Sequence, residues 1–337
     1  MVRLVFNCFV GTILSGEREF EQVRQEMSYS IGVDLGGTNI KIVVVSNDGE
    51  LLDYLTCDTA DAEGSWAETI KHNLAQIRIK RGHAPCHIGI ASPGLAARDG
   101  RSIAHMRGRL NGIEGFVWTD FLDSPSPVFV LNDAHAALLG ELWQGAAKGY
   151  TNVILLTLGT GVGGAVLADG RLIKGHIGRA GHLGHVSVNS DGAGDIVGTP
   201  GSLEQMIGNY NIRERSNGRF ESTRKLVEAH LQGDKEASQV WLRSVFHLAA
   251  ALASFINAFD PEIVIIGGGI AKAGPALFEP LANYLDKLEW RPIGHGVPVI
   301  SASLGERAGA IGAAYHAILE ATKNETPPAS AGGTSIS

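Results

Sequence analysis

The chain of 337 residues is poor in cysteine, in proline and in positive charge. Its three cysteines (Cys8, Cys57 and Cys86) form no C-x-x-C pair. Their scatter excludes a disulfide framework and a cysteine-rich zinc site, and fits a reducing compartment. Lys and Arg number 28 against 35 Asp and Glu, so the net charge of −7 offers nothing to attract nucleic acid. The apolar runs at 248–256 and 263–266 are far shorter than the roughly 18 residues that a membrane span needs.

Glycine is the residue that the sequence has in excess, at 44 of 337 positions, about 13% against a usual 7% or so. Only 12 prolines accompany it, so the composition is not of low complexity. The glycines therefore serve backbone geometry, and their positions matter. Hydrophobic residues make up 44% of the chain, and this length and composition predict two packed domains.

The two ends of the chain differ from the rest. Residues 1–27 imitate a signal peptide, but Asn7 interrupts the apolar stretch and no A-x-A-like cleavage site follows. We interpret them as an extension that precedes a true start at Met27, with export and an ordered extension as the alternatives. Residues 324–337 are rich in Pro, Gly and Ser and predict a disordered tail.

Two segments, 31–45 and 152–168, have the pattern strand, glycine-rich turn, strand. Their similarity predicts a duplicated domain plan. Further strands are expected at 50–57, 86–91, 128–131, 261–269 and 297–302, and helices at 65–81, after 132, and at 202–208, 221–231, 236–259 and 306–320. This alternation predicts an α/β protein. One face of the long helix would carry Val240, Trp241, Val245, Leu248, Leu252, Phe255 and Phe259.

The two glycine-rich turns are candidate phosphate sites. In D-L-G-G-T (34–38), small residues let backbone amides approach a phosphate, and the adjacent carboxylate can hold Mg²⁺ through water. L-G-T-G-V-G-G (158–164) lacks the G-K-[ST] of a Walker loop and joins two strands, so it is not a dinucleotide fingerprint. Each turn alone could be an ordinary hairpin. Together they could grip one polyphosphate from both sides.

Two further segments lie at the ends of strands. I-V-I-I-G-G-G-I-A (263–271) offers flat glycine backbone against which adenine or ribose could lie, although a strand-to-helix turn would look the same. In L-N-D-A-H (131–135), Asp133 is either a helix N-cap or a general base for a hydroxyl, and the two roles are compatible.

The segment G-R-A-G-H-L-G-H-V-S-V (178–188) places His182 and His185 three residues apart. With His176 they could form a metal cluster, but the segment is glycine-rich and not obviously helical. Imidazole offers one donor and one acceptor, which favours recognition of hydroxyl groups. Simple packing is the remaining alternative.

In their order and spacing these five segments resemble the ROK family of sugar kinases and repressors, within the actin-like ATPase superfamily, over residues 30–320. The resemblance implies a two-lobed actin-like (ribonuclease H-like) fold with its active site in the cleft between the domains. A small domain would contain 28–134 plus 305–323, and a large domain 135–304.

The resemblance also implies a glucokinase-like, cytoplasmic homodimer that uses ATP and Mg²⁺ to phosphorylate a hexose, with glucose and its 6-OH as the default. Asp133 would be the catalytic base, and Asp34 would hold Mg²⁺ through water. Phosphate and nucleotide contacts would come from Gly36, Gly37, Thr38, Gly159, Thr160, Gly161, Gly267, Gly268 and Gly269. Sugar contacts would come from Asn111, Asn132, His182, His185 and Glu204.

One departure from the family pattern concerns zinc. Members usually carry C-x-C-G-x-x-G-C-x-E, whose three cysteines bind a structural zinc together with the histidine. Here the cysteine positions hold Asp195, Val197 and Ser202. These side chains with one histidine cannot form a tetrahedral thiolate site. We therefore predict a zinc-free branch in which loop packing replaces the metal and His185 serves the sugar alone.

Two other departures leave the sugar open. His182 stands where the family usually has Glu, and imidazole is no longer a fixed acceptor. L-N-G-I-E-G-F (110–116) is one residue longer than the family's N-L-P-G-W sugar loop, where Asn111 is the natural ligand. N-acetylmannosamine, mannose and fructose remain alternatives to glucose.

Three rival functions belong to other classes. A repressor of the same family would need an N-terminal helix-turn-helix, for which the 33 residues before Asp34 are too few and too acidic. A catalytically dead sugar sensor is disfavoured by the intact Asp133 and phosphate turns. A filament-forming or chaperone-like ATPase is disfavoured by the sugar motifs.

Overall fold

The computed structural model describes residues 28–59, 64–106 and 108–325. The expected N-terminal extension (1–27) lies outside the described residues, as does most of the expected tail. The last helix, α10 (Ala308–Glu325), continues to Glu325, so the expected end of that helix at 320 was too early. Residues 324 and 325, which were expected to begin a disordered tail, are therefore the last two residues of this helix.

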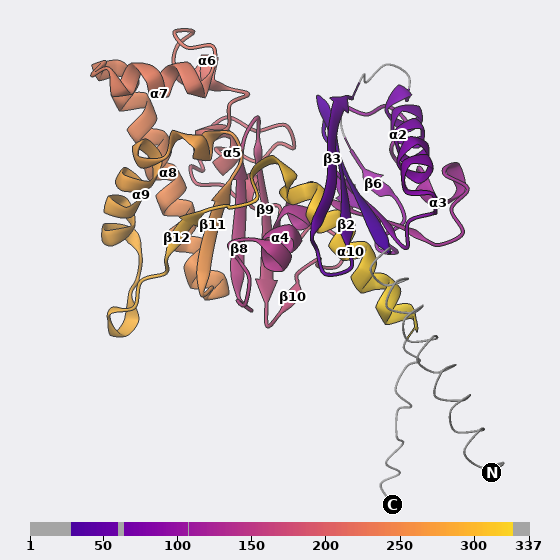
Figure 1. Cartoon of the computed structure of the whole chain (residues 1–337). Coiled ribbons are helices and arrows are strands. Elements are labelled where there is room, and N and C mark those ends of the chain that lie inside the picture. The colour runs from indigo at the N-terminus through magenta and orange to yellow at the C-terminus, as the bar shows by residue number, and fades with distance from the viewer. Residues whose placement is uncertain (1–27, 60–63, 107, 326–337) are drawn as a thin grey trace, which may run out of the picture.

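The first sheet has the order β3–β2–β1–β4–β7. Its strands are β1 (Tyr29–Leu35), β2 (Asn39–Ser46), β3 (Leu51–Asp58), β4 (Ile88–Ser92) and β7 (Val128–Asn132). Strand β2 is antiparallel to both β1 and β3, whereas β4 and β7 run parallel to β1. Helices α2 (Ser65–Arg81) and α3 (Trp118–Phe121) cover one face, and the small hairpin β5 (Leu95–Ala96) and β6 (Ile103–His105) lies beside them (Figure 1).

The second sheet repeats this plan, as the two glycine-rich segments predicted. Its order is β10–β9–β8–β11–β12. The strands are β8 (Val153–Leu158), β9 (Val162–Ala168), β10 (Arg171–Leu172), β11 (Ile263–Gly267) and β12 (Val299–Ser301). Again an antiparallel trio is followed by two parallel strands.

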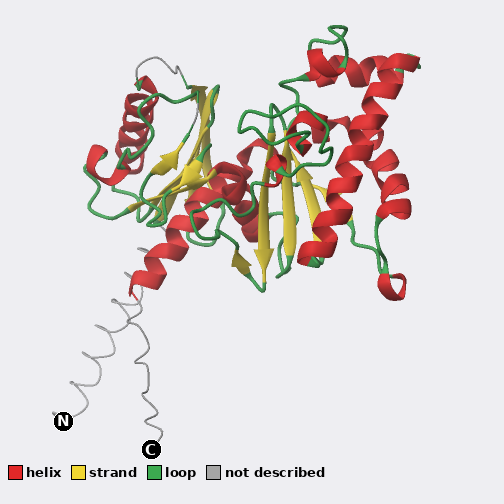
Figure 2. Cartoon of the chain, turned by 180° about the vertical axis from the view of Figure 1, so that it is seen from behind, coloured by secondary structure: helices red, strands yellow, loops and turns green. Residues whose placement is uncertain are grey.

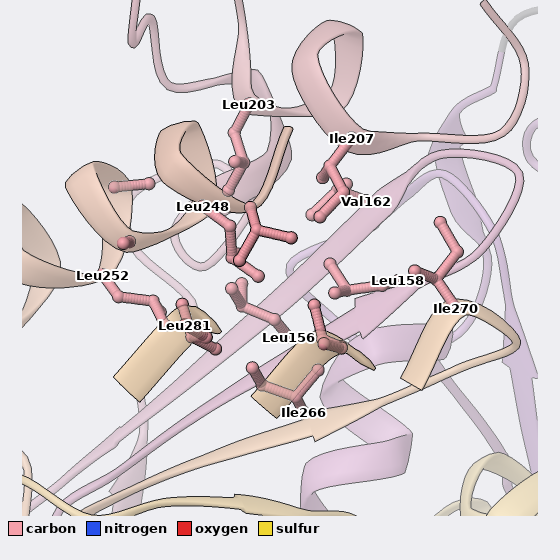
Figure 3. Packing of buried hydrophobic residues seen from close by; sticks show 14 of the residues in the cluster. Leu156, Leu158, Val162, Leu203, Ile207, Leu248, Leu252, Ile266, Ile270 and Leu281 are labelled. Carbon is pink, nitrogen blue, oxygen red and sulfur yellow. The ribbon is translucent and has the colours of Figure 1, made fainter. Parts of the chain in front are cut away.

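Helices on the outer face of the second sheet form the largest core. They are α5 (Leu203–Ile207), α6 (Ile212–Arg215), α7 (Thr223–Leu231), α8 (Lys235–Phe259) and α9 (Pro275–Leu288), with short 3-10 turns at Leu183–His185, Ile270–Ala273, Pro292–Gly294 and Gly305–Arg307. Figure 3 shows Leu156 and Ile266 of the sheet meeting Leu248 and Leu252 of α8. This core holds the end of β8 that carries the second glycine-rich turn.

Helix α8 agrees with its expected bounds, but its buried face differs. Trp241, Val245 and Leu248 are fully buried, whereas Phe259 at the C-terminal end is 36% exposed. By length and composition α8 could cross a membrane, yet half of its most apolar window is buried inside the fold, as in the core helix of a globular protein.

Helix α9 was not expected, although Leu277, Leu281 and Leu285 are spaced four apart and buried. Pro280 lies inside it, within two turns of its start. A proline at this place is the feature that argues against a helix in the sequence, and here the apolar stripe outweighs it.

Two helices lie between the sheets: α4 (Asp133–Gln144) packs on the second sheet and α10 on the first (Figures 1 and 2). They cross backbone against backbone. A Cβ on Gly312 would lie 1.7 Å from the carbonyl oxygen of Ala136, and one on Gly140 would lie 2.3 Å from that of Ala308. The two sheets are therefore joined through the crossing of α4 and α10, which tolerates no side chain at these glycines.

This crossing generates a prediction. Helix propensity alone favours Gly312→Ala by about 1 kcal/mol. Because the new methyl would overlap a carbonyl oxygen, we expect a net loss of about 2–3 kcal/mol of unfolding free energy instead, measured by urea unfolding. Ser254→Ala, on the exposed side of α8, is the control and should stay within about 0.5 kcal/mol of the parent. A Gly312→Ala protein as stable as the parent would show that the crossing is not tight.

Candidate functional site

Asp34 lies near the end of β1, directly across from Lys41 of β2. Their side chains are 15% and 21% exposed, and Lys41 Nζ is 3.5 Å from Asp34 Oδ2. Burial raises the pKa of Asp34 to about 6, the lysine opposes the rise, and the charge of Asp133 adds to it. The structure thus brings together the two acidic residues singled out in the sequence, which are 99 positions apart, and pairs one of them with Lys41.

The first glycine-rich turn connects β1 to β2. The N–H of Gly36 donates to the carbonyl of Asn39 at 3.1 Å, and Thr59 fixes the turn by donating its hydroxyl to the carbonyl of Gly36 at 2.6 Å. The N–H groups of Gly37 and Thr38 donate to no acceptor among the described residues. Free amides in a turn of this kind suit a phosphate oxygen.

The second turn, between β8 and β9, has the same property. The carbonyls of Gly159 and Thr160 accept from the N–H groups of Asn209 and Tyr210, at 3.0 and 2.9 Å. Within the described chain, however, the N–H groups of Thr160 and Gly161 have no acceptor. The turn is therefore held from behind and keeps two donors for a ligand.

Glu204 of α5 supports this second turn. Its Oε2 accepts from the N–H of Val162 at 2.9 Å, and lies 2.1 Å from where a Cβ on Gly161 would be. The sequence indicated only a sugar contact for Glu204. Its buried carboxylate has a structural contact as well, and a Cβ at position 161 would displace the carboxylate from that contact.

The third glycine segment follows β11 and reaches the same place. Gly268 has φ +86°, and a Cβ there would lie 2.3 Å from the carbonyl oxygen of Leu158, the last residue of β8. Gly269 has no neighbour within 4 Å of its Cβ position, and so leaves open space. The second turn and this segment thus form one continuous stretch of bare backbone.

At the start of α4, the helix cap is Asn132, not Asp133. Asn132 Oδ1 accepts from the N–H groups of Ala134 and His135, at 3.0 and 3.3 Å, and its Nδ2 donates to the carbonyl of Gly94 at 3.0 Å. Asp133 is the first helical residue, and its Oδ1 accepts from the N–H of Ala134 at 2.8 Å. Burial raises the pKa of Asp133, and the nearby His182 opposes the rise.

His182 presents a defined acceptor. Its Nδ1 lies 3.1 Å from the carbonyl oxygen of Arg179, and because a carbonyl only accepts, Nδ1 carries the proton. Burial lowers the pKa of the ring, so it is neutral near pH 7 and Nε2 is left with a lone pair. With Nδ1 protonated, Nε2 would be the acceptor of an uncharged ring, whereas the family's Glu carries a charge.

His135 is a site residue that the sequence did not single out. Its Nε2 lies 3.0 Å from the carbonyl oxygen of Ala180, and its ring stands edge to face with that of His182, with centroids 6.1 Å apart. Burial lowers its pKa to about 4. The sequence did offer a signal, because His135 is the lone polar residue in the otherwise apolar stretch A-H-A-A-L-L. Through Ala180, His135 positions the segment that carries His182.

His185 contacts the residue that replaces a family cysteine. Its Nδ1 lies 2.8 Å from Oδ2 of Asp195, whose side chain is fully buried. Asp195 Oδ1 accepts from the N–H groups of Val197 and Thr199. Although burial raises the pKa of Asp195, the hydrogen bonds from His185, Thr199 and Ser202 together lower it. Across the described ranges, no three or more His, Cys, Asp or Glu residues are grouped as a metal would need.

Asn111 and His176 are both exposed residues of loops. Asn111 is exposed in a turn between β6 and α3, and His176 is exposed in the loop after β10. No hydrogen bond or ion pair among the described residues joins either side chain to Asp34, Asp133 or His182.

Comparison with known proteins places these features in a family. The ROK family matches residues 30–320. Glucokinase of Thermotoga maritima is 35% identical over 305 residues, 84% of this chain and 95% of that protein. N-acetylmannosamine kinase of Escherichia fergusonii is 30% identical over 292 residues, 85% of this chain and 97% of that protein.

A solved structure agrees with the fold. The crystal structure of a ROK family glucokinase from Streptomyces griseus, in complex with glucose and AMPPNP, is 29% identical, with a TM-score of 0.72 over 87% of this chain and 100% of that one. This likeness confirms the expected α/β, actin-like ATPase fold. Sequence and structure match over nearly the whole described length, and the chain belongs to the ROK family.

Proposed function

We propose that this chain transfers the terminal phosphoryl group of ATP to a hydroxyl of a glucose-like hexose, by family analogy the 6-OH. The observation that carries the proposal is that Asp34, Asp133 and His182 lie close enough to interact electrostatically. They do so in a chain whose two glycine-rich turns have backbone N–H groups without an acceptor among the described residues. The decisive assay measures ADP release with a panel of hexoses, with and without Mg²⁺. No hexose-dependent ADP release with any sugar would contradict it.

Asp133 is the proposed base. The substrate hydroxyl gives its proton to the Asp133 carboxylate while its oxygen bonds to the γ-phosphorus, and the bond from that phosphorus to the bridging oxygen of ADP breaks. A pKa raised by burial suits a group that must accept a proton. Asn132 acts indirectly in this scheme, because its amide caps α4 and so fixes Asp133.

Asp34 fits a cation site. Burial raises the pKa of its carboxyl, the charge of Asp133 adds to the rise, and a divalent cation would relieve both effects. When bound through water at Asp34, Mg²⁺ would neutralise charge on the phosphates. The free amides of the two glycine turns would hold phosphate oxygens, and Gly267, Gly268 and Gly269 would lie against the nucleoside.

Glucose is the first candidate for the sugar, because glucokinases are among the similar proteins. We assign hydroxyl contacts to Asn111, His182, His185 and Glu204. N-acetylmannosamine, mannose and fructose are the alternatives, the first favoured by the similarity to an N-acetylmannosamine kinase. A non-catalytic sugar sensor is the rival from another class, and the ADP assay separates it.

The proposal also covers the domains, the cellular location and assembly, the absence of zinc, and the partners of the protein. Residues 28–134 with 305–323 form the small domain and 135–304 the large one, with the site between them. The protein works in the cytoplasm as a homodimer. It binds no zinc, since Asp195 ties the loop that the family secures with metal. It has no nucleic-acid or membrane partner.

The first test replaces the base. We expect Asp133→Asn to lower kcat by about 10²–10⁴ while glucose binding, measured by isothermal titration, stays within about threefold. The fold should survive, because Asn132 supplies the cap. Asn132→Ala is the matched variant and should instead lose about 1 kcal/mol of stability. An Asp133→Asn enzyme that keeps more than about a tenth of the parent kcat would refute the role.

The second test uses pH. The folded-state pKa of Asp34 is raised from 3.8 to about 6, so its favourable contribution to stability is complete below pH 3.8 and is lost as the pH rises through about 6. At pH 7.5 the ionised group therefore destabilises the fold. We expect Asp34→Asn to raise Tm at pH 7.5 by about 2 °C or more, with little gain at pH 4.5, while Mg²⁺-dependent activity is lost.

Asp191→Asn, at an exposed position, is the control for that experiment and should show no such pH-dependent gain. A Tm for Asp34→Asn at or below that of the parent at pH 7.5 would mean that the pair with Lys41 outweighs burial.

The third test concerns zinc. We expect elemental analysis of the purified protein to find no stoichiometric zinc, and EDTA to leave the fold intact. EDTA should stop activity by removing Mg²⁺, and excess Mg²⁺ alone should restore it. Asp195→Ala should destabilise the protein, because His185 and the amides of Val197 and Thr199 lose their acceptor. One zinc per chain that survives dialysis would contradict this assignment.

A further inference from the structure

Arg109 lies against the first glycine-rich turn. Its Nη1, Cδ and Cζ atoms are 2.7, 3.1 and 3.6 Å from the point that a Cβ on Gly37 would occupy. The guanidinium therefore rests on the bare backbone of Gly37, and any side chain at that position would displace it. The resemblance to the ROK family gave no role to Arg109.

The backbone around Arg109 is held in an uncommon conformation. Leu110 has φ +54°, a region that L side chains rarely adopt, and its side chain is 1% exposed in the core under the first sheet. Glu114 Oε1 accepts from the N–H of Met106 at 2.7 Å across the base of the same loop. Burial of Leu110 thus fixes the neighbouring Arg109 over the turn.

Arg109 has no acidic partner in the part of the chain that the structure describes: no carboxylate oxygen there lies within 4.0 Å of its guanidinium. Lys41, the other cation at this turn, is paired with Asp34. In a chain of net charge −7, an exposed and unpaired arginine beside the free amides of Gly37 and Thr38 is a donor set for an anion. A guanidinium fork matches phosphate oxygens in a way that an ammonium does not.

We propose that Arg109 binds the phosphoryl group that passes from nucleotide to sugar. The inference rests on the proposed function. Arg109 faces the phosphate turn, while Asn111, two residues on in the same loop, is the assigned sugar contact. A residue between the two reaches the phosphate that moves between them, so it interacts with the γ-phosphate and not with the phosphates that remain in ADP.

The test compares nucleotides by isothermal titration in the presence of Mg²⁺. We expect Arg109→Gln to weaken binding of AMPPNP about tenfold and that of ADP less than about twofold, since hydrogen bonds to charged groups are the strong ones. Arg109→Lys should lie between the parent and the Gln variant. In turnover, kcat should fall while KM for the sugar stays within about twofold. Arg224→Gln is the control, on α7 with an 88% exposed side chain, and should change nothing.

Each other outcome overturns the inference. Unchanged AMPPNP binding and kcat would mean that Arg109 only covers the turn, and tighter binding would mean that it obstructs it. Equal losses for AMPPNP and ADP would place it on a phosphate that is not transferred. In these cases the parent protein still binds AMPPNP and phosphorylates a hexose. A parent protein that does neither would overturn the proposed function, and this inference with it.

Discussion

The crossing of α4 and α10 is the contact on which the rest of the structure depends. At the crossing, each helix places a glycine against a backbone carbonyl of the other helix. These glycines are Gly140 and Gly312. Glu141 secures the crossing. Its fully buried carboxylate accepts from the N–H of Ala146 in its own segment and from the N–H groups of Ser303 and Leu304, which lead into α10. The Ser303 hydroxyl donates to the same carboxylate, and a buried carboxylate with these four donors is stable only if all of them stay in place.

This crossing also sets the distance between the two acidic residues of the site. Asp133 is the first residue of α4, while Asp34 packs against Gly309 in the first turn of α10, whose Cβ position is 3.0 Å from the carboxyl carbon of Asp34. Asp133 is thus part of α4, and Asp34 is in contact with α10. A change in the angle between α4 and α10 would move Asp34 relative to Asp133, and so the geometry of the proposed phosphoryl transfer would depend on the packing between the sheets.

Much of this arrangement could be predicted from local patterns. Glycine turns between apolar strands predicted both hairpins, and apolar spacing predicted α2, α7 and α8, because these signals lie within a few residues of one another. What failed depends on distant partners. Phe259 is apolar and in register with the buried face, yet it is the last residue of α8 and is 36% exposed. A Cβ at 161 or at 37 would meet Glu204 or Arg109, 43 and 72 residues away, and no local pattern shows that.

The replacements at the family's sites of Glu and zinc follow one physical logic. Three histidines at the site are oriented by acceptors: the carbonyls of Arg179 and Ala180, and the carboxylate of Asp195. Burial keeps His135 and His182 neutral, so their contacts are directional hydrogen bonds and not charge pairs. Placing His182 where the family usually has Glu leaves Asp133 with one negative neighbour fewer, while burial still raises the pKa of Asp133. One negative charge fewer beside Asp133 and Asp34 lowers the electrostatic cost of holding two carboxylates in one buried site.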